Sequence, residues 1–312
     1  MTIDDFTSVV SQRIMDFLPE GFEGAKIDVY NTIKNSKRVH GICIRLKGQN
    51  VAPVFYMENY FEEGIEDVTD DIIMSIVKDA EPYYKDYLEG KDAKAVEEKL
   101  LKFKIDNYDF IKGYLRPIVV NSRYYSELLQ NFDYKIINDM AVLLIVEIPQ
   151  SVFKYGPSCI KVSREIQSLW NISFDELLRT AVDNLNPEEF ILRDVSCHFS
   201  GEKEINLLRE SSIDSKNTLY ELTSKETMYG ACGILCDAVM NKICSLFPEG
   251  YYIIPSSVHE CLIISENISE CPERLKEQLT SINLNENLIT SDDVLSFDIY
   301  RYDKEQNELL AV

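Results

Sequence analysis

The most informative part of the sequence is LYELTSKETMYGACGILCDAVMNKICSLFPEGYYIIPSSVHECLII, residues 219–264. Its apolar pattern predicts a strand over 219–222, a helix over 231–246 and then two strands over 251–254 and 258–264. The segment 254–260, IPSSVHE, places serines, a histidine and a glutamate between these apolar strands. Polar side chains in such a position need a structural or chemical reason, so we expect any site to lie here.

The rest of the chain alternates helices with antiparallel strands, and Thr2 and Ser173 precede two of the helices as expected N-caps. The N-terminal region is expected to form a hairpin at 26–46, with a turn at 35–37, and helices over 3–18, 72–88 and 93–103; the second helix starts near Thr69 and is interrupted at Pro82. The central region is expected to form strands over 115–120, 140–148 and 158–162 and helices over 124–129 and 173–185. A helix over 272–284 and a strand over 295–302 are expected near the C-terminus.

This order predicts an α+β fold in which antiparallel sheet hairpins alternate with helices. Residues 115–185 and 219–285 both read strand, helix, two strands, helix, which indicates a degenerate internal repeat. We expect three parts: an N-terminal helix and hairpin lobe over 1–113, a first α+β unit over 114–200 and a second over 201–312. The charged, serine-containing stretch 201–216 is the expected linker.

The composition is that of a globular protein with a strong negative charge. The 312 residues are 45% hydrophobic, and the formal net charge is −21. Such a charge repels phosphate backbones, so direct nucleic-acid binding is not expected. The acidity indicates either a solvated surface or a nucleic-acid mimic that occupies a basic groove of a partner.

The compartment is expected to be the cytoplasm. The N-terminal residues show no secretory signal, and the longest apolar run, 140–146, is too short to span a membrane. The eight cysteines are scattered through apolar segments, which is typical of reduced thiols.

Several short motifs resemble a family known as domain of unknown function 5688, found in gut Firmicutes. The motifs, spread over nearly the whole chain, are Lys34-Asn35, 52–58 (APVFYME), Val120-Asn121, 138–142 (NDMAV), Trp170 with Glu176-Leu177, Tyr229-Gly230-Ala231, 254–260, 294–296 (VLS) and 300–302 (YRY). Ser224 departs from an asparagine usual in that family, and 131–134 (NFDY) replaces a Pro-His-like element. More distantly, 170–185 and 219–264 resemble domain of unknown function 1444 of bacilli. Both resemblances imply an α+β fold, and neither implies an activity.

The motifs supply the candidate binding residues Asn121, Asn138, Asp139, Tyr229 and Gly230.

The candidate catalytic residues are Ser256, Ser257, His259 and Glu260. If 258–264 is a strand, Ser257, His259 and Cys261 share one face, and a Ser257–His259 pair is within reach. A hydrolase also needs an orienting acid and an oxyanion hole, and no Gly-x-Ser-x-Gly elbow occurs in the sequence. The alternative is structural: the serines cap a turn after Pro255, and His259 bonds to neighbouring backbone.

No metal or cofactor is expected. Cys232 and Cys236, one helical turn apart, would need His259 and Cys261 from the facing strand to form a zinc site. Ordinary burial of cysteine explains the same pattern. His40 and His198 are isolated, and neither a Walker loop nor a Gly-x-Gly-x-x-Gly motif occurs in the sequence.

The leading hypothesis is therefore a protein-interaction or regulatory module without catalysis, acting on a protein partner and not on nucleic acid or membrane. The alternatives are a hydrolase-like enzyme centred on Ser257 and His259, and an acidic mimic that inhibits a nucleic-acid-binding partner. The sequence does not indicate an oligomeric state.

Overall fold

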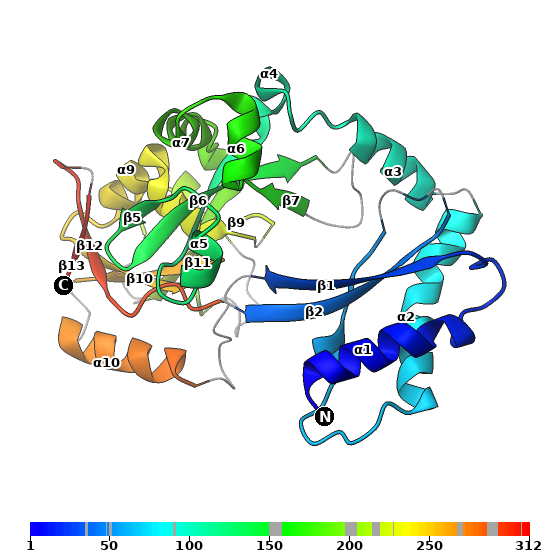
Figure 1. Ribbon diagram of the computed structural model, residues 1–312. Helices are drawn as coiled ribbons and strands as arrows, with labels where there is room; N and C mark the ends of the chain where they lie inside the picture. Colours follow the sequence, from blue (N-terminus) through cyan, green and yellow to red (C-terminus); the bar gives the residue numbers. More distant parts are fainter. Residues whose placement is uncertain are drawn as a thin grey trace. The chain divides into compact units, whose positions relative to one another are not determined.

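The computed structural model describes residues 1–34, 37–47, 49, 52–89, 92–149, 158–196, 205–213, 219–226, 228–266, 271–285, 293–306 and 308–312 (Figure 1). The predicted turn at 35–37 and linker at 201–216 lie partly outside these residues, and His198 lies wholly outside them. The chain forms two compact units, Met1–Phe103 and Lys104–Gln150 with Tyr155–Val312. The three-part division at residues 113 and 200 stays a prediction.

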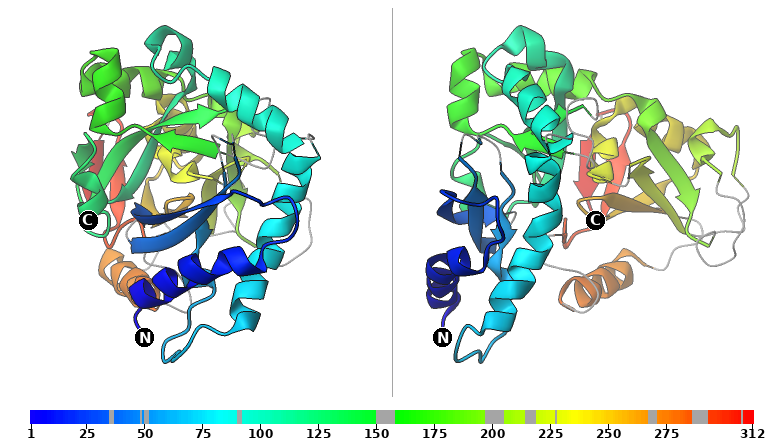
Figure 2. Two further views of the ribbon diagram at one scale, coloured as in Figure 1. Left: turned by 45° about the vertical axis from the view of Figure 1, so that its right-hand side comes forward. Right: turned by 90° about the vertical axis from the view of Figure 1, so that its right-hand side faces the viewer.

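The first unit is a hairpin covered by helices. Its elements are α1 (Ile3–Arg13), η1 (Ile14–Phe17), β1 (Lys26–Lys34), β2 (Lys37–Arg45), β3 (Phe55–Tyr56), η2 (Met57–Asn59), α2 (Asp70–Leu88) and α3 (Asp92–Lys102). Thr2 and Asp5 form the predicted capping box of α1. Ile42 and Ile44 point to one face of β2 and pack with apolar residues of α1 and α2 in a single core, so both helices bury their apolar stripes on this hairpin. The ribbons of α1 and α2 lie beside the hairpin (Figure 2).

Helix α2 runs through Pro82 without the predicted interruption. Pro82 removes the hydrogen bond to the carbonyl of Lys78, but both residues are exposed, so that carbonyl is accessible to water. The buried residues Ile76, Ala80 and Tyr84 continue the apolar stripe across the proline. Packing of this stripe outweighs the local penalty.

The second unit contains two antiparallel sheets. Its first half comprises α4 (Tyr108–Ile111), η3 (Lys112–Tyr114), β4 (Leu115–Asn121), α5 (Ser126–Leu129), β5 (Lys135–Ile137), β6 (Met140–Ile148), β7 (Ser158–Lys161), α6 (Arg164–Trp170) and α7 (Phe174–Asp183). Strand β6 is the centre of this sheet: β4 pairs along one side, and β5 and β7 pair with its two ends on the other. Burial on both faces explains why β6 is an almost uninterrupted apolar run.

The second half of this unit holds a sheet of order β13-β12-β10-β11-β9-β8. Its elements are η4 (Pro187–Glu189), β8 (Phe190–Asp194), η5 (Leu207–Arg209), β9 (Leu219–Ser224), η6 (Gly230–Leu235), α9 (Asp237–Leu246), β10 (Tyr251–Ser257), β11 (Glu260–Ser265), α10 (Pro272–Asn283), β12 (Tyr300–Asp303) and β13 (Glu308–Ala311). Helix α10 packs Leu275 and Leu279 onto Tyr252 and Ile254 of β10.

The predicted α+β class with antiparallel hairpins is confirmed, and two further element predictions in this unit are corrected by the structure. The helix expected over 231–246 divides into η6 and α9, because Cys236 adopts an extended backbone between them. The strand expected over 295–302 begins only at Tyr300, because 294–299 is held by side-chain hydrogen bonds instead of a ladder.

The internal repeat stays a prediction, although the two halves of the second unit share a strand order. The first has β4-β6-β5, and the second contains β9-β11-β10. Of the helices in the described part of the chain, none combines the length and hydropathy needed to cross a bilayer.

Candidate functional site

The β10–β11 hairpin turns at Val258 and His259. Strand β10 continues through Pro255 to Ser257, and Ser257 pairs with Glu260. Strand β10 is therefore longer than the predicted 251–254, and the strand predicted to start at Val258 starts at Glu260. Pro255 fits in a strand here because the register shifts between Ile254 and Ser257, and an irregularity of this kind tolerates the missing N–H.

The His259 ring is held from both sides. Its Nδ1 accepts a hydrogen bond from the backbone N–H of Tyr229 at 3.2 Å, and its Nε2 lies 3.7 Å from a carboxylate oxygen of Asp293. The Tyr229 ring lies against it with centroids 5.9 Å apart, and the side chain is 38% exposed. Because Nδ1 accepts, the ring proton of the neutral form is on Nε2, towards Asp293.

Ser257 and His259 do not form a nucleophile–base pair. The Ser257 hydroxyl oxygen accepts a hydrogen bond from the backbone N–H of His259 at 3.1 Å. The face sharing expected for Ser257, His259 and Cys261 fails because His259 belongs to the turn. The ring nitrogen needed to take the serine proton is instead bonded to Tyr229.

Tyr229 and Gly230 pack directly against this turn. Tyr229 has a left-handed backbone with φ of 50°. A Cβ on Gly230 would lie 2.3 Å from the backbone nitrogen of Ser224 and 2.5 Å from the carbonyl oxygen of His259. Only glycine allows η6 to approach both β9 and the hairpin turn this closely.

A pocket of about 250 Å³ opens beside Tyr229, within the second unit. Much of its lining is apolar, and its polar groups include the Arg116 guanidinium, the Glu147 carboxylate and the Cys159 thiol. Arg116 pairs with Ile145 across β4 and β6, so it lies diagonal to Glu147, and its Nε is 3.4 Å from the carboxylate. The Cys159 thiol and the Tyr229 hydroxyl are neighbours in this lining.

The pocket shifts the protonation of its lining groups. Burial raises the pKa of Glu147; Arg116 opposes this rise, and the charges of Glu189 and Glu226 reinforce it. Burial also raises the pKa of the Cys159 thiol and of the Tyr229 hydroxyl. Both groups are therefore protonated at neutral pH and are not activated nucleophiles.

Ser256 and Glu260 belong to a separate polar cluster on the sheet. The Ser256 hydroxyl donates to Glu260 at 3.3 Å. Burial raises the pKa of Glu260, and a neighbouring charge and hydrogen bond from Glu221 raise it further. Arg193 binds Glu221 through two hydrogen bonds of 3.0 and 2.8 Å. Burial and Glu221 thus favour the protonated form of Glu260, whereas the two hydrogen bonds from Arg193 favour the ionised form of Glu221.

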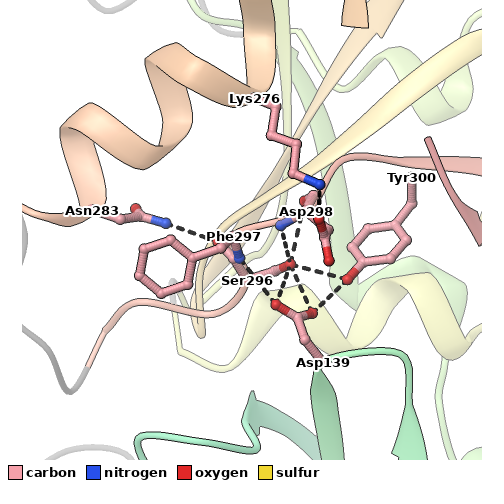
Figure 3. A network of polar contacts seen from close by, with 7 residues as sticks. All are labelled: Asp139, Lys276, Asn283, Ser296, Phe297, Asp298 and Tyr300. Atoms are coloured by element: carbon pink, nitrogen blue, oxygen red, sulfur yellow. Dashed lines mark hydrogen bonds and ion pairs between the residues drawn. The ribbon is translucent and has the colours of Figure 1, made fainter. Parts of the chain in front are cut away.

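Asp139, in the β5–β6 turn, is the centre of a second polar network (Figure 3). It binds the segment 293–299, which we call the strap. Its carboxylate accepts hydrogen bonds from the Ser296 hydroxyl at 2.8 Å, the Phe297 N–H at 3.0 Å and the Tyr300 hydroxyl at 2.5 Å. Ser296 and Tyr300 are fully buried. Asn283 of α10 donates to the Ser296 carbonyl at 2.8 Å, which ties the helix to the same strap.

Asn121 and Asn138 hold the same region. The Asn121 side chain donates to the Leu295 carbonyl at 3.1 Å and accepts from the N–H groups of Arg123 and Tyr124. Asn138 has φ of 55° in the β5–β6 turn and donates to the Leu309 carbonyl at 2.9 Å. The structure therefore joins Asn121, Asn138 and Asp139 to the C-terminal strap and strands, and joins Tyr229 and Gly230 to His259.

The cysteines of the metal hypothesis are core residues. Cys232, Cys236 and Cys261 are all buried. Within the described ranges, His, Cys, Asp and Glu side chains nowhere gather in threes as metal ligands. The absence of a bound metal stays a prediction.

A comparison with family models finds one match over nearly the whole chain. Residues 3–304 match the model described as Family of unknown function (DUF5688). The chain belongs to DUF5688. This confirms the resemblance inferred from the short motifs, while the likeness to domain of unknown function 1444 stays a prediction. No curated protein and no solved structure matches the chain.

The pocket of this DUF5688 protein was not predicted from the sequence, although two signals were present. Glu147 is the one acid within the apolar strand 140–148, and Arg116 is the one base in the strand 115–120. Opposite charges on two adjacent buried strands predict an ion pair once the strands are known to be neighbours. The missing step was the pairing of β4 with β6.

We expect Gly230→Ala to destabilise the protein by about 1–3 kcal/mol, because the methyl group would displace backbone in β9 and in the hairpin turn. Gly113→Ala is the matched control, since a Cβ there has no heavy atom within 4 Å. Denaturant unfolding of the two variants checks this. Equal stability of the two would show that the close approach is not a constraint.

We expect Asp139→Asn to lower the free energy of unfolding by about 1–3 kcal/mol, because its amide would face hydroxyl and amide donors. Asp298→Asn removes a carboxylate that pairs with Lys276 near the surface, and it should change stability by less than about 1 kcal/mol. Denaturant unfolding measures both values. A larger loss in the Asp298 variant would contradict the central role of Asp139.

Glu260→Gln should stabilise the protein increasingly as pH rises. A carboxyl group whose pKa is raised on folding adds stability below its unfolded pKa, and this is lost as pH rises through the folded value. Glutamine needs no proton, so the variant should match wild type at roughly pH 4 and melt higher at about pH 7. Glu249→Gln, at an exposed position, controls for charge removal. A melting-temperature difference that does not change with pH would refute the raised pKa of Glu260.

Proposed function

We propose that this DUF5688 protein is a protein-interaction module without catalysis, and that the pocket beside Tyr229 receives one side chain of a partner protein. The proposal rests on this pocket of about 250 Å³, where apolar side chains surround the Arg116–Glu147 ion pair. An apolar lining with a few convergent polar groups is typical of binding sites.

The size of the pocket supports a side chain as its occupant. Pockets for drug-sized ligands and cofactors occupy roughly 300–1,000 Å³. The volume of about 250 Å³ is below this range. An anchor residue of a protein partner fits such a space, and interface energy concentrates on anchors that fill pockets of this kind.

The protonation of the pocket supports binding over covalent catalysis. The Cys159 thiol and Tyr229 hydroxyl are neighbours in the pocket, and both are neutral at physiological pH. In the neighbouring turn, the His259 Nδ1 that would serve Ser257 as a base accepts from backbone instead. These contacts support a structural role for His259 and weigh against the hydrolase alternative.

The acidic mimic is the weaker alternative because it assigns no role to a pocket with an apolar lining. The scattered reduced cysteines support a cytoplasmic location for the proposed interaction.

Filling the pocket should abolish partner binding. Ser158 is half-buried in the pocket lining on β7, so Ser158→Tyr should occupy the space. Met228→Trp fills it from another segment, and Ser245→Tyr, on the exposed face of α9, is the matched control. The measurement is quantitative capture of proteins from an extract of the native host on each immobilised variant.

We expect at least one protein to be captured by wild type and by Ser245→Tyr and to be lost with both filled variants, provided that these melt like wild type. A capture profile that is the same for wild type and the folded filled variants would refute the proposed role of the pocket.

A further inference from the structure

We propose that the side chain received by this pocket is an arginine or lysine from a basic segment of the partner protein. This rests on the proposed function above and specifies the chemistry of the occupant. The pocket lining contains three acidic residues, Glu147, Glu189 and Glu226, and two basic residues, Arg116 and Lys225. The excess of negative charge favours a cationic ligand.

Arg116 is already engaged by the protein. Its guanidinium donates to the carbonyl oxygens of Gly113 and Leu115, each at 3.0 Å, and lies beside Glu147. Its side chain is 21% exposed, whereas that of Glu147 is 47% exposed. An incoming ligand therefore has better access to the carboxylate than to the guanidinium, which again favours a cation over an anion.

The apolar lining matches the remainder of a basic side chain. Ile118, Ile145, Leu185 and Phe190 contribute to the pocket. Arginine and lysine carry methylene stems that pack on apolar surface while the charged head remains at a polar group. A stem against these residues and a head at Glu147 would use both kinds of lining together.

The charge of Glu147 is only partly compensated by the protein. Burial raises its pKa, Arg116 offsets part of this rise, and Glu189 and Glu226 oppose ionisation further. A cation at this position would relieve both effects, so its binding is favoured electrostatically. The net charge of −21 would also speed the approach of a basic partner segment.

The test uses the full-length protein, immobilised, with two libraries of short acetylated and amidated peptides. One library has a central arginine with random neutral flanks, and the other has citrulline, its neutral isostere, at that position. Mass spectrometry measures the retained peptides on wild type, Glu147→Gln, Ser158→Tyr and Glu249→Gln.

We expect wild type and Glu249→Gln to retain the arginine library roughly 10- to 100-fold better than the citrulline library. Glu147→Gln should abolish this preference while its melting temperature stays close to that of wild type. Ser158→Tyr should retain neither library.

Three results would overturn the inference in distinguishable ways. If wild type retains both libraries equally and Ser158→Tyr retains neither, the pocket binds a side chain but does not select a cation. If Ser158→Tyr still prefers the arginine library, the preference comes from the general acidity of the surface and not from the pocket. No retention of either library by wild type would count against the proposed function as well.

Discussion

The second unit depends on one partly buried carboxylate. Asp139 accepts hydrogen bonds from two hydroxyl groups and one backbone N–H, all contributed by residues 296–300. A carboxylate that lost these donors would stay partly desolvated without compensation, which is unfavourable by several kcal/mol. The strap has no ladder to either side over most of its length, so its conformation is fixed by this carboxylate and by the amides of Asn121 and Asn283. Through the strap, Asp139 also positions the start of β12 and the C-terminal end of α10.

The strap contacts the hairpin turns of both halves of this unit. Its later residues bind the Asn138–Asp139 turn, while its first residues meet the other turn: the Asp293 carbonyl accepts from the Val258 N–H at 3.0 Å, and Val294 bridges to Ser257. His259 completes this contact through Asp293 and extends it to Tyr229. Most of the polar residues in the motifs that resemble DUF5688 therefore have hydrogen-bonding roles in the fold. Their presence in a motif does not require them to act on a substrate.

Features set by local chemistry were predictable from the sequence, whereas those set by tertiary contacts were not. Thr2 and Ser173 cap their helices as expected, because an N-cap needs only the side chain and the next turn of backbone. Pro82 does not interrupt α2, because packing of the helix face outweighs one lost hydrogen bond. The turn at Val258–His259 lacks the usual turn residues and is fixed by Gly230 and the strap, both distant in sequence. The pocket needs residues from β4, β6, β7 and η6, so only the lone charges Arg116 and Glu147 signalled it in advance.

The distinction between polar groups used by the fold and those accessible to a ligand separates the candidate sites. The acceptors of Asp139 and the ring nitrogens of His259 face partners from the protein itself, so a ligand there would have to displace existing contacts. Glu147 differs because about half of its side chain is exposed, Arg116 reaches it from one direction at 3.4 Å, and apolar residues surround the space beside it. Completing the coordination of a half-desolvated carboxylate is favourable, whereas competing with a satisfied network is not. This difference in hydrogen-bond saturation, more than the identity of the residues, makes the pocket beside Tyr229 the stronger candidate for function.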